Sequence, residues 1–165
     1  MRFVVPLLNL LSSRTSSTFA MIKPEAVAYP FIAKEILNEI IKNGIEIVGA
    51  KRIRLNRNDA ERLYRIHQEK FFYERLIQHV TSGPVIVMRL RCSSGDAIER
   101  WRTLMGSSKV FRNMLNNRKC LRARFAISDT RNLVHGADSV DTSNYELQLF
   151  GPYPPYDQQK LIAQS

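Results

Sequence analysis

The sequence predicts an α+β fold of the ferredoxin-like (split β-α-β) type: a four-stranded antiparallel sheet with helices on one face and short helices around it. Two observations support this prediction. Four segments have the apolar or alternating pattern of strands, and helical patterns separate them in the order β-α-β-αα-β-α-β. The chain of 165 residues also suffices for one domain, which would bury about two-thirds of the surface that its unfolded chain exposes.

The first part of the chain supplies two predicted strands and the helix between them. Residues 18–23 form an apolar run that ends before Pro24, as expected of a buried strand. A helical pattern that ends at Gly44 places these side chains on one face: Ile32, Ile36, Leu37, Ile40 and Ile41. Residues 45–55 alternate like a half-buried strand, with these side chains on one side: Ile45, Ile47, Ile53 and Leu55.

The middle of the chain is predicted to hold two helices and the third strand. Asn56, with Asp59 three residues later, indicates a helix start. The apolar side chains expected on this helix are Leu63, Tyr64 and Ile66. A second helix is expected over residues 71–79, and the strand over residues 85–90, after the break at 82–84.

The next predicted helix begins at a capping-box pattern of Ser93 and Asp96 and ends at Gly106. Residues 107–120, rich in Lys, Arg and Asn, are predicted to form a long loop. Residues 124–127 are predicted to form the fourth strand, which would lead directly to a loop that holds His135.

Composition restricts the function classes. The formal net charge of +10 predicts attraction to an anionic partner: nucleotides, nucleic acid or an acidic membrane surface. Cys92 and Cys120 form neither a metal-binding spacing nor a disulfide framework, which favours a reducing compartment. No apolar run reaches the length that a membrane span needs.

The two ends of the chain differ from the part between them. Residues 1–17 contain Arg2 and Arg14, many Leu and Ser, and no acidic residue, which is typical of a mitochondrial targeting segment. A secretory signal and simple N-terminal disorder are the alternatives. The expected domain covers residues 18–150, and a Pro- and Tyr-containing tail, residues 151–165, follows because its composition continues neither helix nor strand.

His135 is the candidate reactive residue. The residues around it, 132–139, are of the types that build tight, hydrogen-bonded loops. Glu146 follows in a short helical pattern and could fold back onto the imidazole, and a neutral imidazole oriented by a carboxylate is a competent nucleophile. A histidine that makes only structural hydrogen bonds is the alternative. His67 and His79 lie on helical patterns without a carboxylate partner and are interpreted as surface or core residues.

A histidine nucleophile in a basic protein suggests phosphoryl transfer, which needs fixed cations near the phosphates. Lys23, Arg102 and Arg122 are the candidates, and Arg suits phosphate because its planar fork binds two oxygens. Each could equally be a solvated surface charge. No P-loop or protein-kinase motif is present, so side chains would have to hold a nucleotide.

Five stretches together resemble the nucleoside diphosphate kinase family, and within it a divergent mitochondrial branch. They are TFAMIKPEAV (18–27), LYRIHQEKFF (63–72), TSGPV (81–85), WRTLMG (101–106) and TRNLVHGADSV (130–140). The resemblance implies phosphate exchange between nucleoside triphosphates, such as ATP, and nucleoside diphosphates through a phosphohistidine. It also implies Mg²⁺ carried on the nucleotide phosphates, without metal ligands from the protein.

The resemblance implies roles for the residues around the nucleophile. His135 resembles the phosphorylated histidine of the family, Glu146 the carboxylate that orients it, and Tyr64 the tyrosine that steadies its ring. Phe71 resembles the phenylalanine that packs on the base, and such stacking would accept any base because every base has a π face.

The remaining roles concern the sugar and the phosphates. Lys23 and Asn132 resemble contacts to the sugar hydroxyl and the terminal phosphate. Arg102 and Arg122 resemble the phosphate arginines, and Ser108 stands where the family usually has a phosphate-binding threonine.

The chain departs from the family pattern in three places. Ala137 replaces the serine of HGSDS and removes a hydroxyl from the catalytic loop. Residues 122–124 read Arg-Ala-Arg instead of Arg-Gly-Asp, and the 107–120 segment is longer and lacks the family's prolines. Because that segment contacts other subunits in the family, the oligomeric state stays open.

Three functions remain open from the sequence. The first is an active nucleoside diphosphate kinase. The second is a catalytically weak mitochondrial protein that binds nucleotides and interacts with a partner protein. The third, a nucleic-acid-binding module, is motivated only by the net charge, and no nucleic-acid partner is expected because basic and aromatic residues interleave only near 71–73.

Overall fold

The structure, a computed structural model, describes residues 16–163 and confirms the α+β prediction. One antiparallel sheet has the strand order β2-β3-β1-β4. Its strands are β1 (Ser17–Ile22), β2 (Glu46–Arg54), β3 (Pro84–Arg91) and β4 (Val134–Gly136). The predicted targeting segment lies outside the described residues, except for Ser16 and Ser17.

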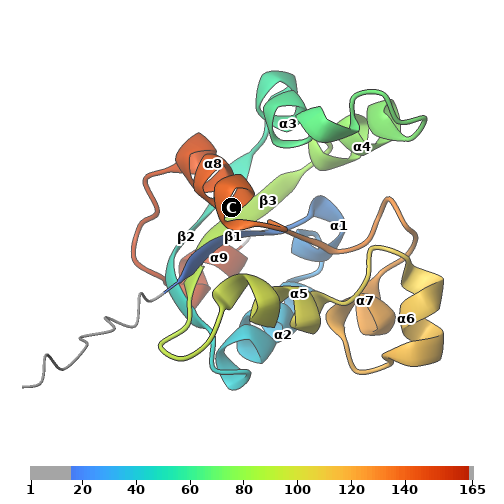
Figure 1. The fold of residues 1–165 in the computed structure, drawn as a ribbon. Helices are drawn as coiled ribbons and strands as arrows, with labels where there is room; N and C mark the ends of the chain where they lie inside the picture. Colours follow the sequence, from blue (N-terminus) through green and yellow to red (C-terminus); the bar gives the residue numbers. More distant parts are fainter. Residues whose placement is uncertain (1–15, 164–165) are drawn as a thin grey trace, which may run out of the picture.

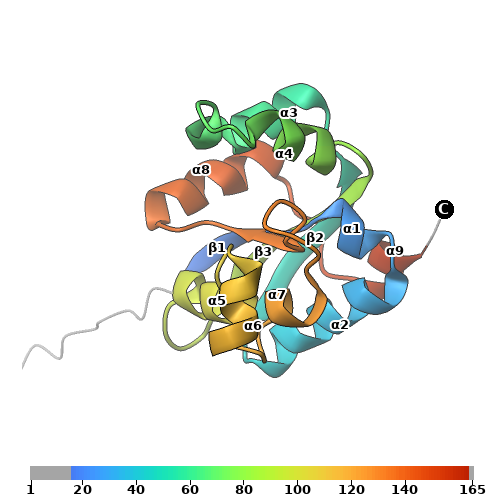
Figure 2. The same cartoon turned by 90° about the vertical axis from the view of Figure 1, so that its right-hand side faces the viewer.

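Helices cover both faces of this sheet (Figures 1 and 2). The core on one face receives side chains from α1 (Pro24–Val27), α2 (Pro30–Lys42), α5 (Ala97–Met105), α7 (Leu121–Phe125) and α9 (Gln158–Ile162). The core on the other face receives them from α3 (Arg57–Leu63), α4 (Tyr73–Val80) and α8 (Val140–Phe150). The prediction of helices on one face was therefore incomplete, because α3, α4 and α8 form a second layer on the other face.

Local signals explain why α2 and α3 form where they were predicted. Pro30 begins α2, where its missing N–H costs nothing. The Asn56 side chain accepts a hydrogen bond of 2.8 Å from the Asp59 N–H and caps α3. The prediction that Ile41 and Ile66 face the core was wrong. Ile41 is 51% exposed, and Ile66, which lies in the 3₁₀ turn Arg65–His67, is 69% exposed. Both lie beyond the stripe that contacts the sheet.

The apolar side chains at the two ends of β2 lie on opposite faces of the sheet. Its pairing with β3 shifts between Ile47 and Gly49, and such a bulge moves the following side chains to the opposite face. Ile45 and Ile47 therefore join one core, whereas Ile53 and Leu55 pack against the other. The prediction of one shared side was wrong because the polarity pattern does not reveal a bulge.

Asp96, rather than Ser93, caps α5. The Asp96 carboxylate accepts a hydrogen bond of 2.8 Å from the Ile98 N–H. Gly95 precedes it with φ of +82°, a left-handed conformation that a helix beginning at Ser93 could not contain. α5 ends at Gly106, as predicted.

Residues 107–127 differ most from their prediction. The expected loop contains α6 (Val110–Asn116), and the expected fourth strand overlaps the end of α7. Four alternating residues do not distinguish a strand from a helical turn. The edge position belongs instead to β4, where His135 pairs with Met21, so His135 lies on a strand and not in a loop.

The segment that follows α8 packs along the outer edge of β2. The Ala50 N–H donates to the Pro154 carbonyl over 2.9 Å, and Gly49 forms a bridge with Pro155. A Cβ at Gly49 would lie 2.6 Å from the Tyr153 carbonyl oxygen, so this approach requires glycine. The domain boundary at residue 150 stays a prediction. None of the helices between residues 16 and 163 is long and apolar enough to span a bilayer.

Candidate active site

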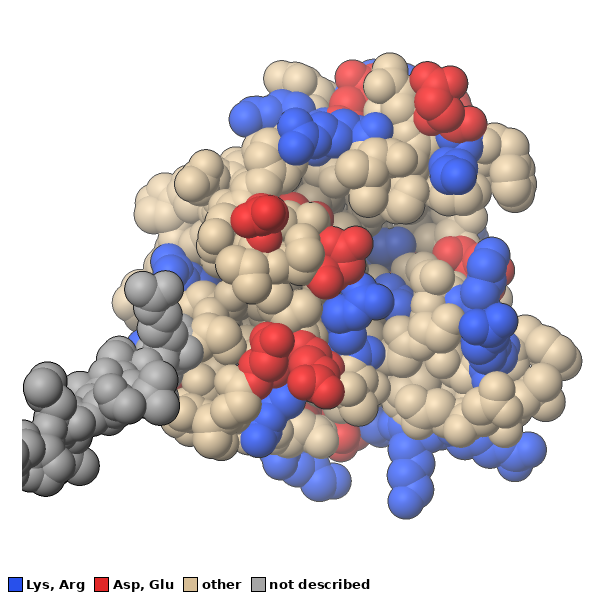
Figure 3. Space-filling view, viewed as in Figure 1, with Lys and Arg blue, Asp and Glu red and all other residues tan. Residues whose placement is uncertain are grey.

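A cleft of about 1190 Å³ opens beside β4, between the α3–α4 region and α5 (Figure 3). All nine candidate side chains line it: Lys23, Tyr64, Phe71, Arg102, Ser108, Arg122, Asn132, His135 and Glu146. Figure 3 shows basic side chains inside the hollow and acidic ones on its rim. The fold thus brings together residues that are far apart in the sequence.

β4 presents His135 to this cleft, and α8 supplies its partner. The His135 Nε2 lies 2.9 Å from the Glu146 Oε1, and the Glu146 side chain is 4% exposed. Because an ionised carboxylate only accepts hydrogen bonds, this contact assigns the proton to Nε2. Nδ1 then carries the lone pair that a nucleophile needs.

Aromatic packing fixes the imidazole and its backbone. Tyr64 lies edge-on to the His135 ring with centroids 5.3 Å apart, and Phe19 lies 5.8 Å away. The Trp101 Nε1 donates to the His135 carbonyl over 3.2 Å. A Cβ at Gly136 would lie 2.5 Å from the Trp101 ring. Glycine after His135 is therefore required by the close approach of Trp101.

Lys23 and Asn132 form a buried polar pair in the cleft. The Lys23 Nζ donates to the Asn132 Oδ1 over 2.7 Å and to the Thr130 carbonyl over 3.3 Å. Burial lowers the pKa of Lys23 to about 8, Glu25 opposes this shift and Arg122 adds to it. A bound anion would favour the charged ammonium.

Arg122 is anchored to the backbone around the cleft. Its guanidinium donates to the carbonyls of Asn132 (3.1 Å), Gly106 (2.7 Å) and Val134 (2.8 Å), and the residue is 7% exposed. Burial lowers its pKa to about 10, which leaves it charged at neutral pH. Arg122 thus ties the end of α5 to β4.

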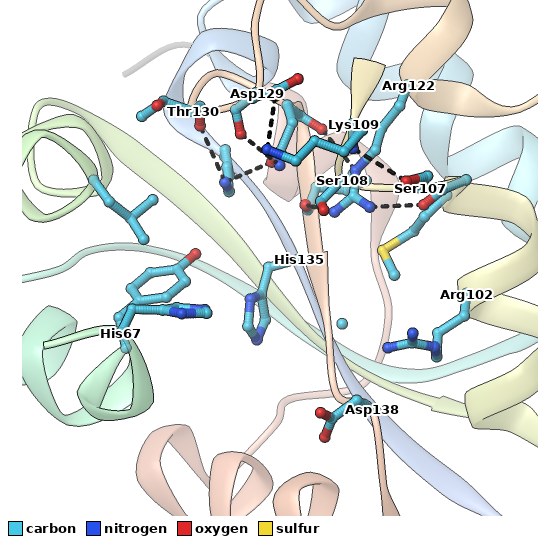
Figure 4. A pocket seen from close by; sticks show the side chains of 18 of the residues that line it. His67, Arg102, Ser107, Ser108, Lys109, Arg122, Asp129, Thr130, His135 and Asp138 are labelled. Atoms are coloured by element: carbon cyan, nitrogen blue, oxygen red, sulfur yellow. Dashed lines mark hydrogen bonds and ion pairs between the residues drawn. The ribbon is translucent and has the colours of Figure 1, made fainter. Parts of the chain in front are cut away.

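The remaining basic groups are more accessible. Figure 4 shows Arg102 across the cleft from His67, and the Arg102 side chain makes no ion pair or hydrogen bond within residues 16–163. Ser108 and Lys109 lie on the segment after α5, and the Lys109 ammonium pairs with the Asp129 carboxylate over 3.1 Å. Lys109 was not among the predicted site residues, although its segment is rich in Lys and Arg.

Two further aromatic residues line the cleft without having been predicted. His67 lies with its ring centroid 6.2 Å from Tyr64 and 5.6 Å from Phe72. Phe72 is half-buried, whereas the neighbouring Phe71 is 88% exposed at the cleft mouth. The stretch LYRIHQEKFF contained both residues, but nothing in its pattern distinguished the cleft side.

Two buried oxygens in the cleft lack partners among the described residues: the Tyr64 hydroxyl and the Glu146 Oε2. Burial and the nearby Glu146 carboxylate raise the pKa of Tyr64, so its hydroxyl stays protonated and can donate to a ligand. The Glu146 Oε2 is the other such oxygen, so the contacts of the carboxylate that orients His135 are incomplete within the described residues.

The comparison with protein families agrees with this geometry. The family model described as "Nucleoside diphosphate kinase" matches residues 16–153, which include every candidate site residue. The chain belongs to the nucleoside diphosphate kinase family. Its fold is therefore that of a nucleoside diphosphate kinase domain.

Individual members of the family show how far the similarity extends. Nucleoside diphosphate kinase 6 of Homo sapiens is 38% identical over 143 residues, which are 87% of this chain and 75% of that protein. The structure of the Aquifex aeolicus nucleoside diphosphate kinase matches with a TM-score of 0.76 and 28% identity over 82% of this chain and 94% of that one. The Halobacterium salinarum enzyme, solved in complex with CDP, matches with the same score and identity over 87% and 93%.

Proposed function

We propose that the protein is an active nucleoside diphosphate kinase, which transfers the terminal phosphate of a nucleoside triphosphate to a nucleoside diphosphate through phosphohistidine 135. The observation that carries this proposal is the 2.9 Å contact between His135 Nε2 and Glu146, which leaves Nδ1 as the nucleophile in a cleft lined by cations.

The reaction has two balanced halves. In the first, the Nδ1 lone pair of His135 attacks the terminal phosphorus, a P–N bond forms, and the P–O bond to the diphosphate breaks with its electron pair on the leaving oxygen. Glu146 stabilises the imidazolium that forms, through the Nε2–H bond. In the second half, a terminal phosphate oxygen of a nucleoside diphosphate attacks the phosphorus, a P–O bond forms, and the P–N bond breaks with its electron pair on Nδ1, which regenerates the neutral ring.

Charge on the phosphates would be neutralised by protein and metal together. Lys23, Arg102 and Arg122 supply fixed positive charge, and the Tyr64 hydroxyl supplies a donor that has no partner among residues 16–163. Mg²⁺ would enter as part of the substrate, on the nucleotide phosphates.

The base would lie at the aromatic end of the cleft. Phe71 supplies an exposed ring for stacking, which discriminates little between bases. The relative from Halobacterium salinarum that was solved with CDP supports a nucleotide in this cleft. We also infer a mitochondrial location from residues 1–17 and from the similarity to nucleoside diphosphate kinase 6.

One observation favours the second candidate, a nucleotide-binding interaction protein of low activity. The Glu146 Oε2 has no partner among the described residues, and Ala137, which replaces the serine of the family motif, is buried and offers no hydroxyl. Reduced activity would follow if the imidazole were held less firmly.

Labelling with radioactive ATP tests the function directly. We expect the wild-type protein to acquire an acid-labile, base-stable phosphate and to pass it to any added nucleoside diphosphate. His135→Ala should acquire none, whereas single variants of His67 and His79 should still be labelled, since they leave the nucleophile in place. Label on His135→Ala, or none on the wild type, would contradict the proposal.

A further inference from the structure

The backbone just before the catalytic strand adopts a conformation that its residue type disfavours. Leu133 has a φ of +81°, in the left-handed region, and its side chain is fully buried. A residue other than glycine persists there only when surrounding contacts hold it. Leu133 follows Asn132 directly and precedes His135 by two positions, so its conformation sets where both side chains lie.

Two backbone contacts hold Leu133 from the segment that follows β1. Its carbonyl accepts a hydrogen bond of 2.9 Å from the Lys23 N–H. Its own N–H donates over 2.8 Å to the Oε1 of Glu25, a residue of α1. The Glu25 side chain is 7% exposed, so this charge-assisted bond is shielded from water.

The second oxygen of Glu25 is also engaged. It lies 2.5 Å from the Nε2 of His79, near the end of α4, whose side chain is 11% exposed. The expectation that His79 has no carboxylate partner was therefore wrong, because the fold brings the partner from 54 positions away. The chain of contacts runs from α4 through His79 and Glu25 to the amide of Leu133.

The charges around Glu25 keep it ionised. Burial raises its pKa, but the hydrogen bond and charge of His79, the charge of Lys23 and the bond from Leu133 outweigh burial, so the pKa lies below its usual value. An ionised carboxylate accepts from both neighbours at once. The proposed reaction uses neither Glu25 nor His79, and neither side chain lines the cleft.

We propose that Glu25 and His79 are positioning residues, which hold the left-handed turn at Leu133 and thereby place His135 and Asn132 in the cleft. The link is physical on both sides, since the stretch before α4 carries Phe71 and Phe72 and the strand after Leu133 carries His135. This inference rests on the proposed phosphotransfer.

Four variants of the full chain test the proposal. Glu25→Gln keeps the shape and removes the charge, and His79→Leu removes the donor to Glu25. His79→Gln restores an amide donor at the same position. Glu74→Gln is the matched control. Glu74 lies on α4, as His79 does, and its substitution breaks an exposed ion pair with Arg57 of α3. Single-turnover phosphorylation by ATP, ADP affinity and amide hydrogen exchange at Leu133 are measured for each.

We expect Glu25→Gln and His79→Leu to slow phosphorylation of His135 by on the order of ten- to a hundredfold, the effect of misplacing a reacting group by about 1 Å. ADP affinity should change far less, because Arg102 lies on α5, outside the contacts that join His79, Glu25 and Leu133. Exchange at Leu133 should accelerate in both variants. His79→Gln should recover most of the rate, and Glu74→Gln should behave as wild type.

The outcomes separate the two proposals. Wild-type rates and unchanged exchange at Leu133 in Glu25→Gln would overturn the positioning role, even if His135 is phosphorylated normally. Failure of the wild type to accept phosphate would overturn the proposed function, while exchange at Leu133 would still test the contact chain. If His79→Leu does not fold, the isosteric Glu25→Gln decides by rate and exchange alone.

Discussion

The two sides of the cleft are built differently. On the cationic side, Lys23 and Arg122 are buried and donate hydrogen bonds to Asn132 and to backbone carbonyls, so their positions are set before a ligand arrives. On the aromatic side, Phe71 is 88% exposed and is contacted by one ring, that of Phe72. Precision is thus concentrated where phosphate charge develops, whereas the base meets a surface that only needs to be flat and apolar.

Substitution of the two phosphate arginines on the cationic side should affect protein stability differently. Arg102→Ala should weaken ADP binding by about 1.5–3 kcal/mol, the usual loss for a charge-assisted hydrogen bond, with little change in unfolding free energy. Arg122→Ala should lose as much binding and also about 3–5 kcal/mol of stability, because two buried carbonyls and one partly buried carbonyl lose their donor. Calorimetry and urea unfolding measure both. Equal stability of the two variants would remove the distinction between anchored and accessible cations.

Removal of a ring from the aromatic side should weaken the binding of every nucleotide without creating a preference for one base. Phe71→Ala and Phe72→Ala should each weaken nucleotide binding by about 1–3 kcal/mol, as expected for a lost base-stacking ring. The more affected variant identifies the ring that carries the base. Affinities for ADP, GDP, CDP and UDP measured side by side should fall together. A strong preference for one base that survives Phe71→Ala would show that hydrogen bonds, and not stacking, select the base.

The pH dependence of ADP binding tests the role of Lys23 on the cationic side. The pKa of Lys23 near 8 in the unliganded protein, lowered by burial, should rise when phosphate binds. ADP binding should therefore be pH-independent below about 8 and weaken by up to about tenfold per pH unit above it. Lys23→Arg should abolish this slope, because arginine stays charged. An unchanged slope in Lys23→Arg would assign the titration to another group.

The smallest effect is expected at Ala137. Ala137→Ser supplies a buried hydroxyl, which we expect to donate to the Glu146 Oε2, an atom without a partner in the described part of the chain, and to hold the His135 ring more firmly. One added hydrogen bond of about 1 kcal/mol corresponds to a rate increase of about fivefold. Single-turnover phosphorylation should rise while ADP affinity stays constant. Equal rates in the two proteins would make Ala137 neutral and direct attention to residues 107–120.

Local signals in the sequence predicted the longer elements and the residues of the motifs. α2 and β3 have apolar faces that repeat over several turns or residue pairs, and the Asn56 cap is readable within four residues. α7 and β4 contain five and three residues, too few for a period to emerge. Their type is decided by tertiary contacts, such as the pairing of His135 with Met21.

The same division applies to the site. Each motif residue could be assigned to the cleft because its stretch resembled a known family. The contacts that hold the residues could not, since the Glu25–His79 and Arg122–backbone bonds join elements with no shared local pattern. What a side chain does in chemistry was thus more visible in the sequence than what keeps it in place.

The tail that lies along β2 also governs how one molecule meets another. An edge strand with unpaired N–H and C=O groups is a template for pairing with another chain and for aggregation. At Gly49 and Ala50 this template is occupied by the molecule's own residues, and Pro154 and Pro155 have no backbone N–H to offer in turn. The sheet therefore cannot accept a fifth strand at this point. Cleavage after Phe150 would expose the backbone N–H and C=O groups of β2, which could then pair with another chain.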